Sequence, residues 1–370
     1  MDKKAFENEL RNLFDKVLFN RKQFCSDQQK ELYTNIRERA SEYAETDFSD
    51  SRARRLFRIV KKQDFSSLTD LLRKENIISF TSYPARIAYI KPTVESLIKQ
   101  RMPADRIILW LADSQFENRE SDIPEDILEL LNRNNIEVKW CPDVKAHKKY
   151  LYGMRQFPEA NVITVDDDLI YDTEFMEELY LSYLEYPDCV SANRVHLILF
   201  DKNEKPIQYS RWVKETRNCL YTPAMQLIAT GGAGALYPAA ILNDEYLKEE
   251  LINELCPLAD DLWLKAVELI SNVPVVLAND HYELNVYEPT QTDTLFSKNG
   301  GMMKNDEQIK AITAWFKNRF GKDILAERIL HNDKGVYLNE PDTIIAFLFE
   351  ERKKLKQEIK ALKEKIKEHN

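Results

Sequence analysis

Residues 161–172, NVITVDDDLIYD, are an apolar run that ends in three consecutive aspartates, Asp166, Asp167 and Asp168. Such a run is typical of a buried strand in a parallel sheet. Side chains alternate along an extended chain, so we expect Asp166 and Asp168 to point the same way. Two carboxylates at a strand end form a hard oxygen site suited to Mg²⁺ or Mn²⁺. The stretch therefore predicts a strand with a cation site at its carboxyl end.

Apolar runs alternate with helical patterns on the N-terminal side of this stretch. The expected strands are 77–82, 107–113, 136–141 and 161–168, and the expected helices between them are 86–100, 123–135 and 146–157. Strands that alternate with helices predict βαβ units and a parallel sheet. The pattern beyond about residue 174 is mixed, with helices over 174–185 and 257–270 and strand-like runs over 190–200 and 273–280. We predict an α/β fold with a mixed, Rossmann-like sheet over residues 75–300.

The residue pattern at both ends of the chain differs from that of the expected sheet. Residues 1–74 contain no Gly and no Pro and have helical spacing, which predicts a helical N-terminal extension. The region 301–370 is expected to be helical again, and within 341–367 the apolar residues fall on heptad positions with a break at Arg352. This last helix is compatible with a coiled coil that joins copies of the chain, or with a peripheral contact on an anionic membrane. Acidic residues between its lysines favour the coiled coil.

Composition narrows the functional classes. The net charge of -9 argues against a nucleic-acid partner. The five cysteines have no zinc-like spacing and predict reduced thiols in a cytosolic protein. The N-terminus has no secretory apolar segment, and no stretch reaches the roughly 18 apolar residues that a membrane-spanning helix needs. We therefore expect a cytoplasmic protein whose membrane contact, if it has one, is peripheral at the inner face.

Polar residues follow each expected strand. Parallel sheets bind ligands beyond the carboxyl ends of their strands, so these residues are predicted to share one crevice. Besides the aspartates, they are Thr81, Ser82, Tyr83, Arg86, Asp113, Ser114, Asp143, His147 and Lys148.

Two further motifs lie in the second half of the chain. In GGAGALYP, 231–238, small residues allow the backbone to approach a ligand closely, but the GxGxxG spacing of a dinucleotide site is absent. In ADDLWL, 259–264, Asp260 and Asp261 stand at the start of a helix. Acids there are favoured by the helix dipole, so capping and catalytic roles both remain open.

The order of these motifs resembles that of GT-A glycosyltransferases with a DxD motif, of the type that builds bacterial polysaccharides and glycoconjugates. The motifs that carry the resemblance are TSYPARI (81–87), KKY (148–150), VDDDLIYD (165–172), SANRVH (191–196), GGAGALYP and ADDLWL. The resemblance implies a hexosyltransferase that transfers a sugar from a nucleotide-sugar, with UDP-sugar favoured, to a glycan or lipid-linked glycan acceptor.

The same resemblance assigns roles to residues. The nucleotide-sugar would contact Thr81, Ser82, Tyr83, Arg86, Asp113, His147, Lys148, Asp166, Asp167, Gly232 and Ala233. Asp166, Asp168 and His281 would be ligands of Mn²⁺ or Mg²⁺. Asp261, or else Asp260, would be the general base that takes the acceptor proton in an inverting transfer. Arg194 and His196 would reach the sugar or a phosphate, with a structural role equally open.

Two other functions remain compatible with the sequence. A metal-dependent nucleotidyl- or phosphotransferase needs similar carboxylates, but it usually has a Gly-rich phosphate loop after the first strand, and TSYPAR contains no Gly. A non-catalytic helical assembly protein with a degenerate α/β centre would have no need of the intact aspartate triplet.

Overall fold

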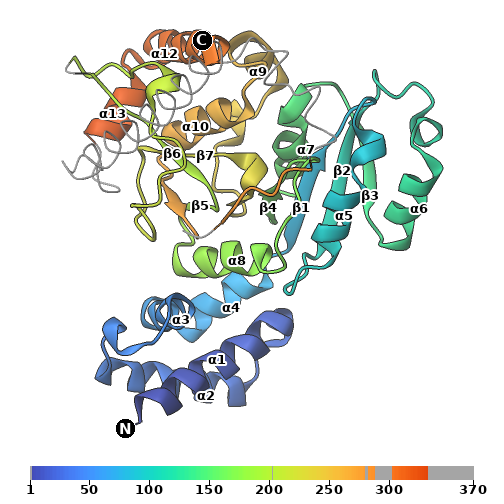
Figure 1. Cartoon of the computed structure of the whole chain (residues 1–370). Coiled ribbons are helices and arrows are strands. Elements are labelled where there is room, and N and C mark those ends of the chain that lie inside the picture. The colour runs from blue at the N-terminus through green and yellow to red at the C-terminus, as the bar shows by residue number, and fades with distance from the viewer. Residues whose placement is uncertain (1, 202, 280–281, 288–301, 332–370) are drawn as a thin grey trace, which may run out of the picture.

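The computed structural model describes residues 2–201, 203–279, 282–287 and 302–331 (Figure 1). The candidate metal ligand His281 and the heptad pattern of 341–367 lie outside these described residues. No helix within the described ranges is both long and apolar enough to cross a membrane.

A seven-stranded mixed sheet forms the centre of the molecule, in the order β3-β2-β1-β4-β8-β5-β9. Four parallel strands make one half: β1 (Asn76–Thr81), β2 (Arg106–Ala112), β3 (Glu137–Cys141) and β4 (Asn161–Thr164). The other half contains β5 (Val190–Ala192), β8 (Ala235–Tyr237) and β9 (Val275–Leu277), and β8 runs antiparallel to β4 and β5. The predicted α/β fold with a mixed sheet is confirmed.

Helices cover both faces of this sheet, as the continuous apolar runs of the parallel strands require. Along β1, Ile78 and Phe80 belong to a core shared with the N-terminal helices, while Ile77 packs with Trp110 on the opposite face. The helices that follow the strands in this half are α5 (Lys91–Ile98), α6 (Glu125–Arg133), α7 (Lys148–Gln156) and α8 (Phe175–Glu185). Of these, α7 packs against β1 and β4, and α8 packs against β5 and β8.

Two expected strands are shorter than their apolar runs. The run 161–168 is a strand only as far as Thr164, and the aspartates lie beyond it in a turn. The run 190–200 splits at Asn193 into β5 and β6 (Val195–Leu197), and β6 pairs with β7 (Leu227–Ala229) in a separate two-stranded sheet.

The C-terminal part of the described chain forms a helical cluster beside the second half of the sheet (Figure 1). Its helices are α9 (Glu249–Leu255), α10 (Asp260–Ser271), α12 (Met302–Phe320) and α13 (Ile324–Leu330). Trp315 lies at their centre, in ring contact with Tyr246, Trp263 and Phe320.

The N-terminal residues form four helices, α1 (Lys3–Phe19), α2 (Asp27–Arg39), α3 (Ser51–Lys62) and α4 (Phe65–Arg73). Aspartates cap the last two, because Asp50 accepts a hydrogen bond from the backbone of Ala53 and Asp64 accepts one from Ser67. The N-terminal helices lie below α8 in Figure 1, and α3 packs directly on α8.

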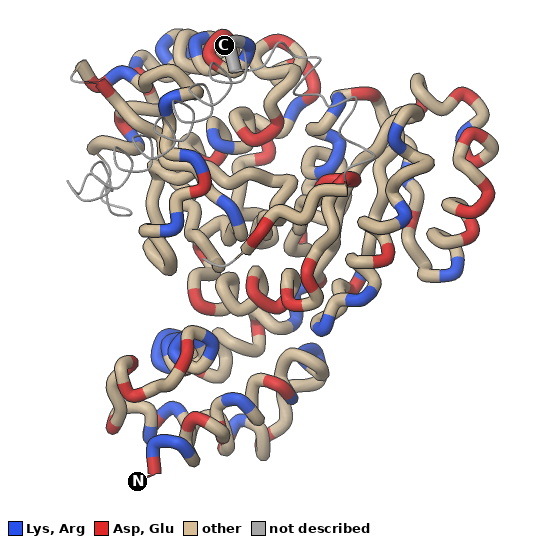
Figure 2. The backbone as a smooth tube through the Cα atoms, in the orientation of Figure 1, with Lys and Arg blue, Asp and Glu red and all other residues tan. Residues whose placement is uncertain are grey.

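Ion pairs join α3 to α8. The basic positions of α3 face the acidic positions of α8 (Figure 2). The carboxylate of Glu185 is fully buried and lies 2.6 Å from Arg58 and 3.2 Å from Lys62, while Arg55, which is also buried, pairs with Glu178 at 2.6 Å. Three basic residues of α3 are therefore neutralised by acids within the chain.

We expect Glu185→Gln to lower the free energy of unfolding by about 3–5 kcal/mol, because it removes the buried carboxylate that pairs with the largely buried Arg58. The measurement is urea denaturation followed by circular dichroism. The matched control is Asp70→Asn, since the Asp70–Arg73 pair is exposed on both sides and contributes little. Equal denaturation midpoints for the two variants would show that α3 does not depend on this ion pair for its docking.

Candidate active site

The strand pairing brings the Gly-rich loop to the aspartates. Because β8 is antiparallel to β4, with Thr164 paired to Ala235, the residues after β4 meet the residues before β8. Gly232 lies so close to Asp166 that a Cβ there would be 2.0 Å from the Asp166 Oδ2 atom. Gly234 has a φ of +99°, and a Cβ there would lie 2.1 Å from the ring of Phe175. Any other residue would be strained at position 234, and at position 232 its Cβ would displace the Asp166 carboxylate.

Tyr171 holds the contact between Asp166 and Gly232 in place. Its hydroxyl accepts a hydrogen bond from the Asp166 backbone N–H at 2.8 Å and donates one to the Gly232 carbonyl at 2.6 Å. The side chain is buried, and it joins the aspartate segment to the glycine loop. Tyr171 belongs to the VDDDLIYD motif, but no role was predicted for it.

Lys149 is the centre of a buried charge cluster. Its side chain is only 3% exposed, and its Nζ atom lies 2.7 Å from Asp166 and 2.7 Å from Asp260. Burial alone would lower the pKa of Lys149, but the carboxylates of Asp166, Asp260 and Asp261 hold that pKa well above its ordinary value. Lys149 is therefore a buried, charged bridge between the end of β4 and the start of α10.

Asp260 and Asp261 have opposite pKa shifts. For Asp260, burial raises the pKa, but the attraction of Lys149 outweighs it, so the pKa falls below the ordinary value. Burial, and then the charge of Asp260, raise the pKa of Asp261 to about 7. Adjacent carboxyl groups with pKa values pushed apart are typical of acid–base sites.

Asp261 does not cap its own helix. The N-cap position of α10 is Ala259, which makes no side-chain cap bond. Asp261 instead accepts a hydrogen bond from the backbone N–H of Gly231 at 2.8 Å. It thereby joins α10 to the same glycine loop that contacts Asp166.

The three consecutive aspartates have separate environments. Asp167 is buried and accepts hydrogen bonds from Ser82 at 2.6 Å and from Arg86 at 2.8 Å. Burial raises its pKa despite the nearby guanidinium. Asp168 pairs with the same Arg86 at 3.0 Å, whereas Asp166 pairs with Lys149. The expected alternation does not describe this segment, because the strand ends before the aspartates and adjacent acids share one arginine.

The residues after β1 support the aspartate turn. The hydroxyl of Thr81 donates to the carbonyl of Trp110 at 2.8 Å, and Ser82 and Arg86 contact Asp167 as above. The guanidinium of Arg86 also lies 5.8 Å from the ring centre of Tyr83. These contacts bring 81–86 to the predicted edge of the sheet, while nucleotide binding by them stays a prediction.

The candidate site residues after β2 and β3 contact residues other than the aspartate triplet. Asp113 pairs with Arg119 at 2.9 Å on an exposed surface, and Lys148 pairs with Asp143 at 3.0 Å. The ring of His147 is fully buried beside the Tyr150 hydroxyl, and burial lowers its pKa to about 4. Within the KKY motif, Lys149 reaches Asp166 and Asp260, whereas Lys148, which is also buried, pairs with Asp143.

Arg194 and His196 lie around the break between β5 and β6. Arg194 pairs with Glu215 at 2.6 Å. His196 is buried, its Nδ1 atom accepts the Glu215 backbone N–H at 3.1 Å, and burial lowers its pKa to about 3. His196 is therefore a neutral core residue in this structure.

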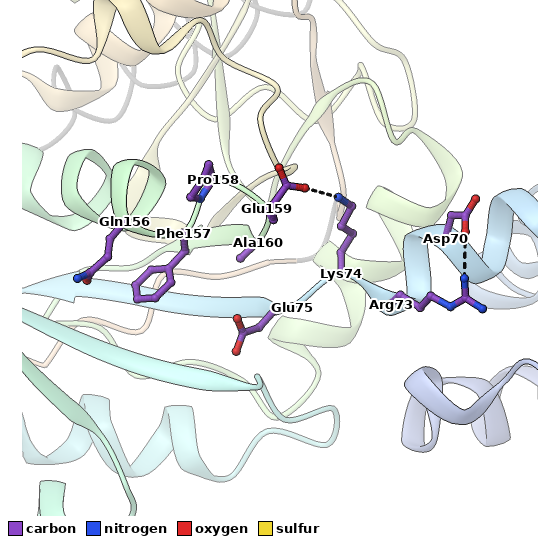
Figure 3. Close-up of a pocket in the computed structure, with 9 residues that line it drawn as sticks. All are labelled: Asp70, Arg73, Lys74, Glu75, Gln156, Phe157, Pro158, Glu159 and Ala160. Carbon is purple, nitrogen blue, oxygen red and sulfur yellow. Dashed lines mark hydrogen bonds and ion pairs between the residues drawn. The ribbon is translucent and has the colours of Figure 1, made fainter.

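A cavity of about 540 Å³ lies at the other end of the sheet, where β1 and β4 begin (Figure 3). It is lined by Asp70, Arg73, Lys74, Glu75, Gln156, Phe157, Pro158, Glu159 and Ala160, and two ion pairs, Arg73–Asp70 and Lys74–Glu159, occupy its rim. Since it faces the amino ends of these strands, it is separate from the cluster around Lys149.

Comparison with known proteins gives little further information. No protein-family model and no curated protein matches the sequence. Among solved structures, the chain is similar to the mannosyltransferase PcManGT from Pyrobaculum calidifontis in complex with GDP-Man and Mn²⁺. The TM-score is 0.35 and the identity 11%, over 87% of this chain and 85% of that one. A likeness with this TM-score carries no argument about function.

The raised pKa of Asp261 predicts an opposite pH dependence for two adjacent variants. The folded protein binds this proton more tightly than the unfolded chain, so the stability that the protonated group contributes is lost as the pH rises from about 4 through about 7. We expect Asp261→Asn to gain stability over the wild type across that window, on the order of 2–4 kcal/mol. Urea midpoints at pH 5 and pH 8 measure this.

The control for this prediction is Asp260→Asn. The lowered pKa of Asp260 contributes stability above the ordinary carboxyl pKa, and that stability is lost as the pH falls. This variant should therefore be less stable than the wild type at pH 8, with the difference shrinking in acid. If the stability of both variants relative to the wild type changes in the same direction with pH, the assignment of opposite pKa shifts is wrong.

Proposed function

We propose that this chain is a metal-dependent glycosyltransferase that moves a sugar from a nucleotide-sugar to a hydroxyl group of a glycan acceptor. The observation that carries the proposal is the cluster of Lys149, Asp166, Asp260 and Asp261 around the loop 231–234, at the carboxyl edge of β4. This is the edge of an α/β sheet at which ligands bind. The Asp261 carboxyl group, whose pKa is raised to about 7, lies there beside carboxylates of the kind that bind hard cations.

The carboxylates of Asp166 and Asp168 are the groups that would hold Mn²⁺ or Mg²⁺. The described residues include no cluster of three or more His, Cys, Asp or Glu side chains that could hold a metal alone. Mg²⁺ is commonly bound through one or two carboxylates and completes its shell with water and substrate phosphates. Two carboxylates thus fit an ion that arrives with a nucleotide diphosphate, and such an ion would neutralise charge on the leaving group.

Asp261 is the proposed general base. A base works best with a pKa near the working pH, and the pKa of Asp261 is raised to about 7. Its hydrogen bond to the Gly231 N–H fixes the carboxylate at the glycine loop. Asp260 and Lys149 position it from the other side, since Lys149 lies between Asp260 and Asp166. This arrangement supports direct, inverting transfer to the acceptor hydroxyl, with UDP-sugar as the first donor to test.

The test is release of nucleotide from UDP- and GDP-sugars with and without Mn²⁺. We expect Asp261→Asn to lower Mn²⁺-dependent turnover by about 10²–10⁴-fold, the usual effect of losing a catalytic acid or base. Asp168→Ala should also lower it strongly, because a ligand of the cation is lost. Asp70→Asn, an exposed acid at the opposite end of the sheet, is the control that should keep wild-type turnover. Consumption of nucleoside triphosphate without sugar transfer would favour a nucleotidyltransferase, and absence of nucleotide binding would favour a scaffold.

Gly232→Ala tests the glycine loop with a single methyl group. The added Cβ overlaps the Asp166 carboxylate, which is half-exposed and able to move, so we expect the fold to persist. Mn²⁺-dependent turnover should fall by at least roughly 10²-fold, because an ångström of misplacement at a catalytic site has such an effect. Circular dichroism and turnover are measured together.

Gly321→Ala is the matched control for this change. A Cβ at Gly321 meets no atom within 4 Å, but the φ of +72° makes the substitution strained. It should lower thermal stability and leave turnover intact. Wild-type turnover in Gly232→Ala would show that Asp166 does not need its present position.

A further inference from the structure

A second cavity, of about 290 Å³, lies beside the break between β5 and β6. Asn193, Arg194, Glu215, Arg217 and Tyr282 are among its lining residues. Its volume is at the lower end of the range of small-molecule sites. The roles proposed for the Lys149 cluster do not use these side chains.

Two buried polar side chains in this cavity lack hydrogen-bond partners. Asn193 is 3% exposed, and neither its Nδ2 nor its Oδ1 atom has a partner among the residues that the structure describes. The hydroxyl of Tyr282, a residue 8% exposed, also has none within the same ranges. Each buried group without a partner costs on the order of 1–3 kcal/mol, so such groups are retained where a ligand or ordered water satisfies them. An amide and a hydroxyl together offer donors and acceptors, the combination that pairs with sugar hydroxyls.

The charges around the cavity favour a neutral ligand. Its lining includes two arginines, Arg194 and Arg217, and two glutamates, Glu215 and Glu283. Arg194 already pairs with Glu215 at 2.6 Å, and Arg217 donates to the Tyr282 carbonyl at 3.3 Å. A phosphate or carboxylate would meet carboxylates as well as guanidinium groups and would gain little net attraction.

The backbone connects this cavity to the candidate active site. Asn193 donates its N–H to the Gly234 carbonyl at 3.1 Å, and Thr230 donates its N–H to the Arg194 carbonyl at 3.1 Å. The same loop contacts Asp261 through Gly231 and Asp166 through Gly232. A ligand in the cavity would therefore lie across one short loop from the proposed base.

We propose that this cavity binds a neutral sugar unit of the acceptor, with Asn193 and Tyr282 hydrogen-bonding its hydroxyl groups. The assignment as acceptor rests on the proposed function, whereas the binding of a hydroxyl-rich ligand does not. Asn193 and Tyr282 are specificity-determining residues in this proposal, and Asp261 remains the base.

The test uses saturation-transfer NMR on the full chain with the methyl glycosides of glucose, galactose, mannose and N-acetylglucosamine as probes, without nucleotide or metal. We expect transfer to at least one glycoside. Tyr282→Phe, which removes only the hydroxyl, should weaken binding by roughly fivefold, as expected for one lost hydrogen bond. Asn193→Leu should weaken it further. Tyr89→Phe, at an exposed tyrosine, is the matched control and should bind as the wild type does.

Two results would overturn the inference. One is absence of transfer to all four glycosides, which would mean that water alone satisfies Asn193 and Tyr282. The other is displacement of the bound glycoside by inorganic phosphate, which would mean that the cavity prefers an anion. Asp261→Asn should retain glycoside binding. If the wild type hydrolyses no donor but still binds a glycoside, the proposed function is wrong and the inference about the cavity stands.

Discussion

The ion pairs of Lys149 are the interaction on which the candidate site depends. Taking an ammonium group out of water is costly, and only close carboxylates with good geometry offset that cost. Asp166 and Asp260, each 2.7 Å from the Nζ atom, provide it. Without the lysine, Asp166, Asp260 and Asp261 would repel one another in a largely buried space. One cation thus holds three segments together at one edge of the sheet. These are the start of α7, the end of β4 and the start of α10.

Sheet topology decides which loop completes this cluster. Had β8 been parallel to β4, the residues before it would lie at the opposite end of the sheet. The antiparallel pairing of Thr164 with Ala235 places the loop 231–234 beside Asp166 instead. The loop then contacts an acid on either side, Asp166 at Gly232 and Asp261 at Gly231. A side chain at Gly232 would occupy the place of the Asp166 carboxylate.

Local patterns predicted the parallel half of the fold better than the site within it. The strands β1, β2 and β3 begin and end within about one residue of their apolar runs, because burial on both faces requires continuous apolar sequence. The aspartate segment, the loop 231–234 and the start of α10 lie together, whereas Asp113 and Lys148 pair with other residues. Lys149 was missed because adjacent lysines at a helix start are typical of a solvated face, and only tertiary packing shows that both are buried and that Lys149 reaches Asp166. The break at Asn193 was missed because apolar residues continue on both sides of it, although the consecutive polar residues Asn193 and Arg194 mark the place where the chain passes from one sheet to another.

The N-terminal helices contribute to this edge of the sheet as well. Arg55 of α3 is buried and donates a hydrogen bond to the carbonyl of Ala278, one residue past β9. The N–H of Ala278 donates in turn to the Ala192 carbonyl at 2.8 Å, directly before Asn193. A guanidinium from the extension therefore stabilises the backbone where β5 and β9 end, next to the cavity that Asn193 lines. Since Glu178 of α8 holds the same guanidinium at 2.6 Å, the docking of the extension and the geometry of that strand end are physically linked.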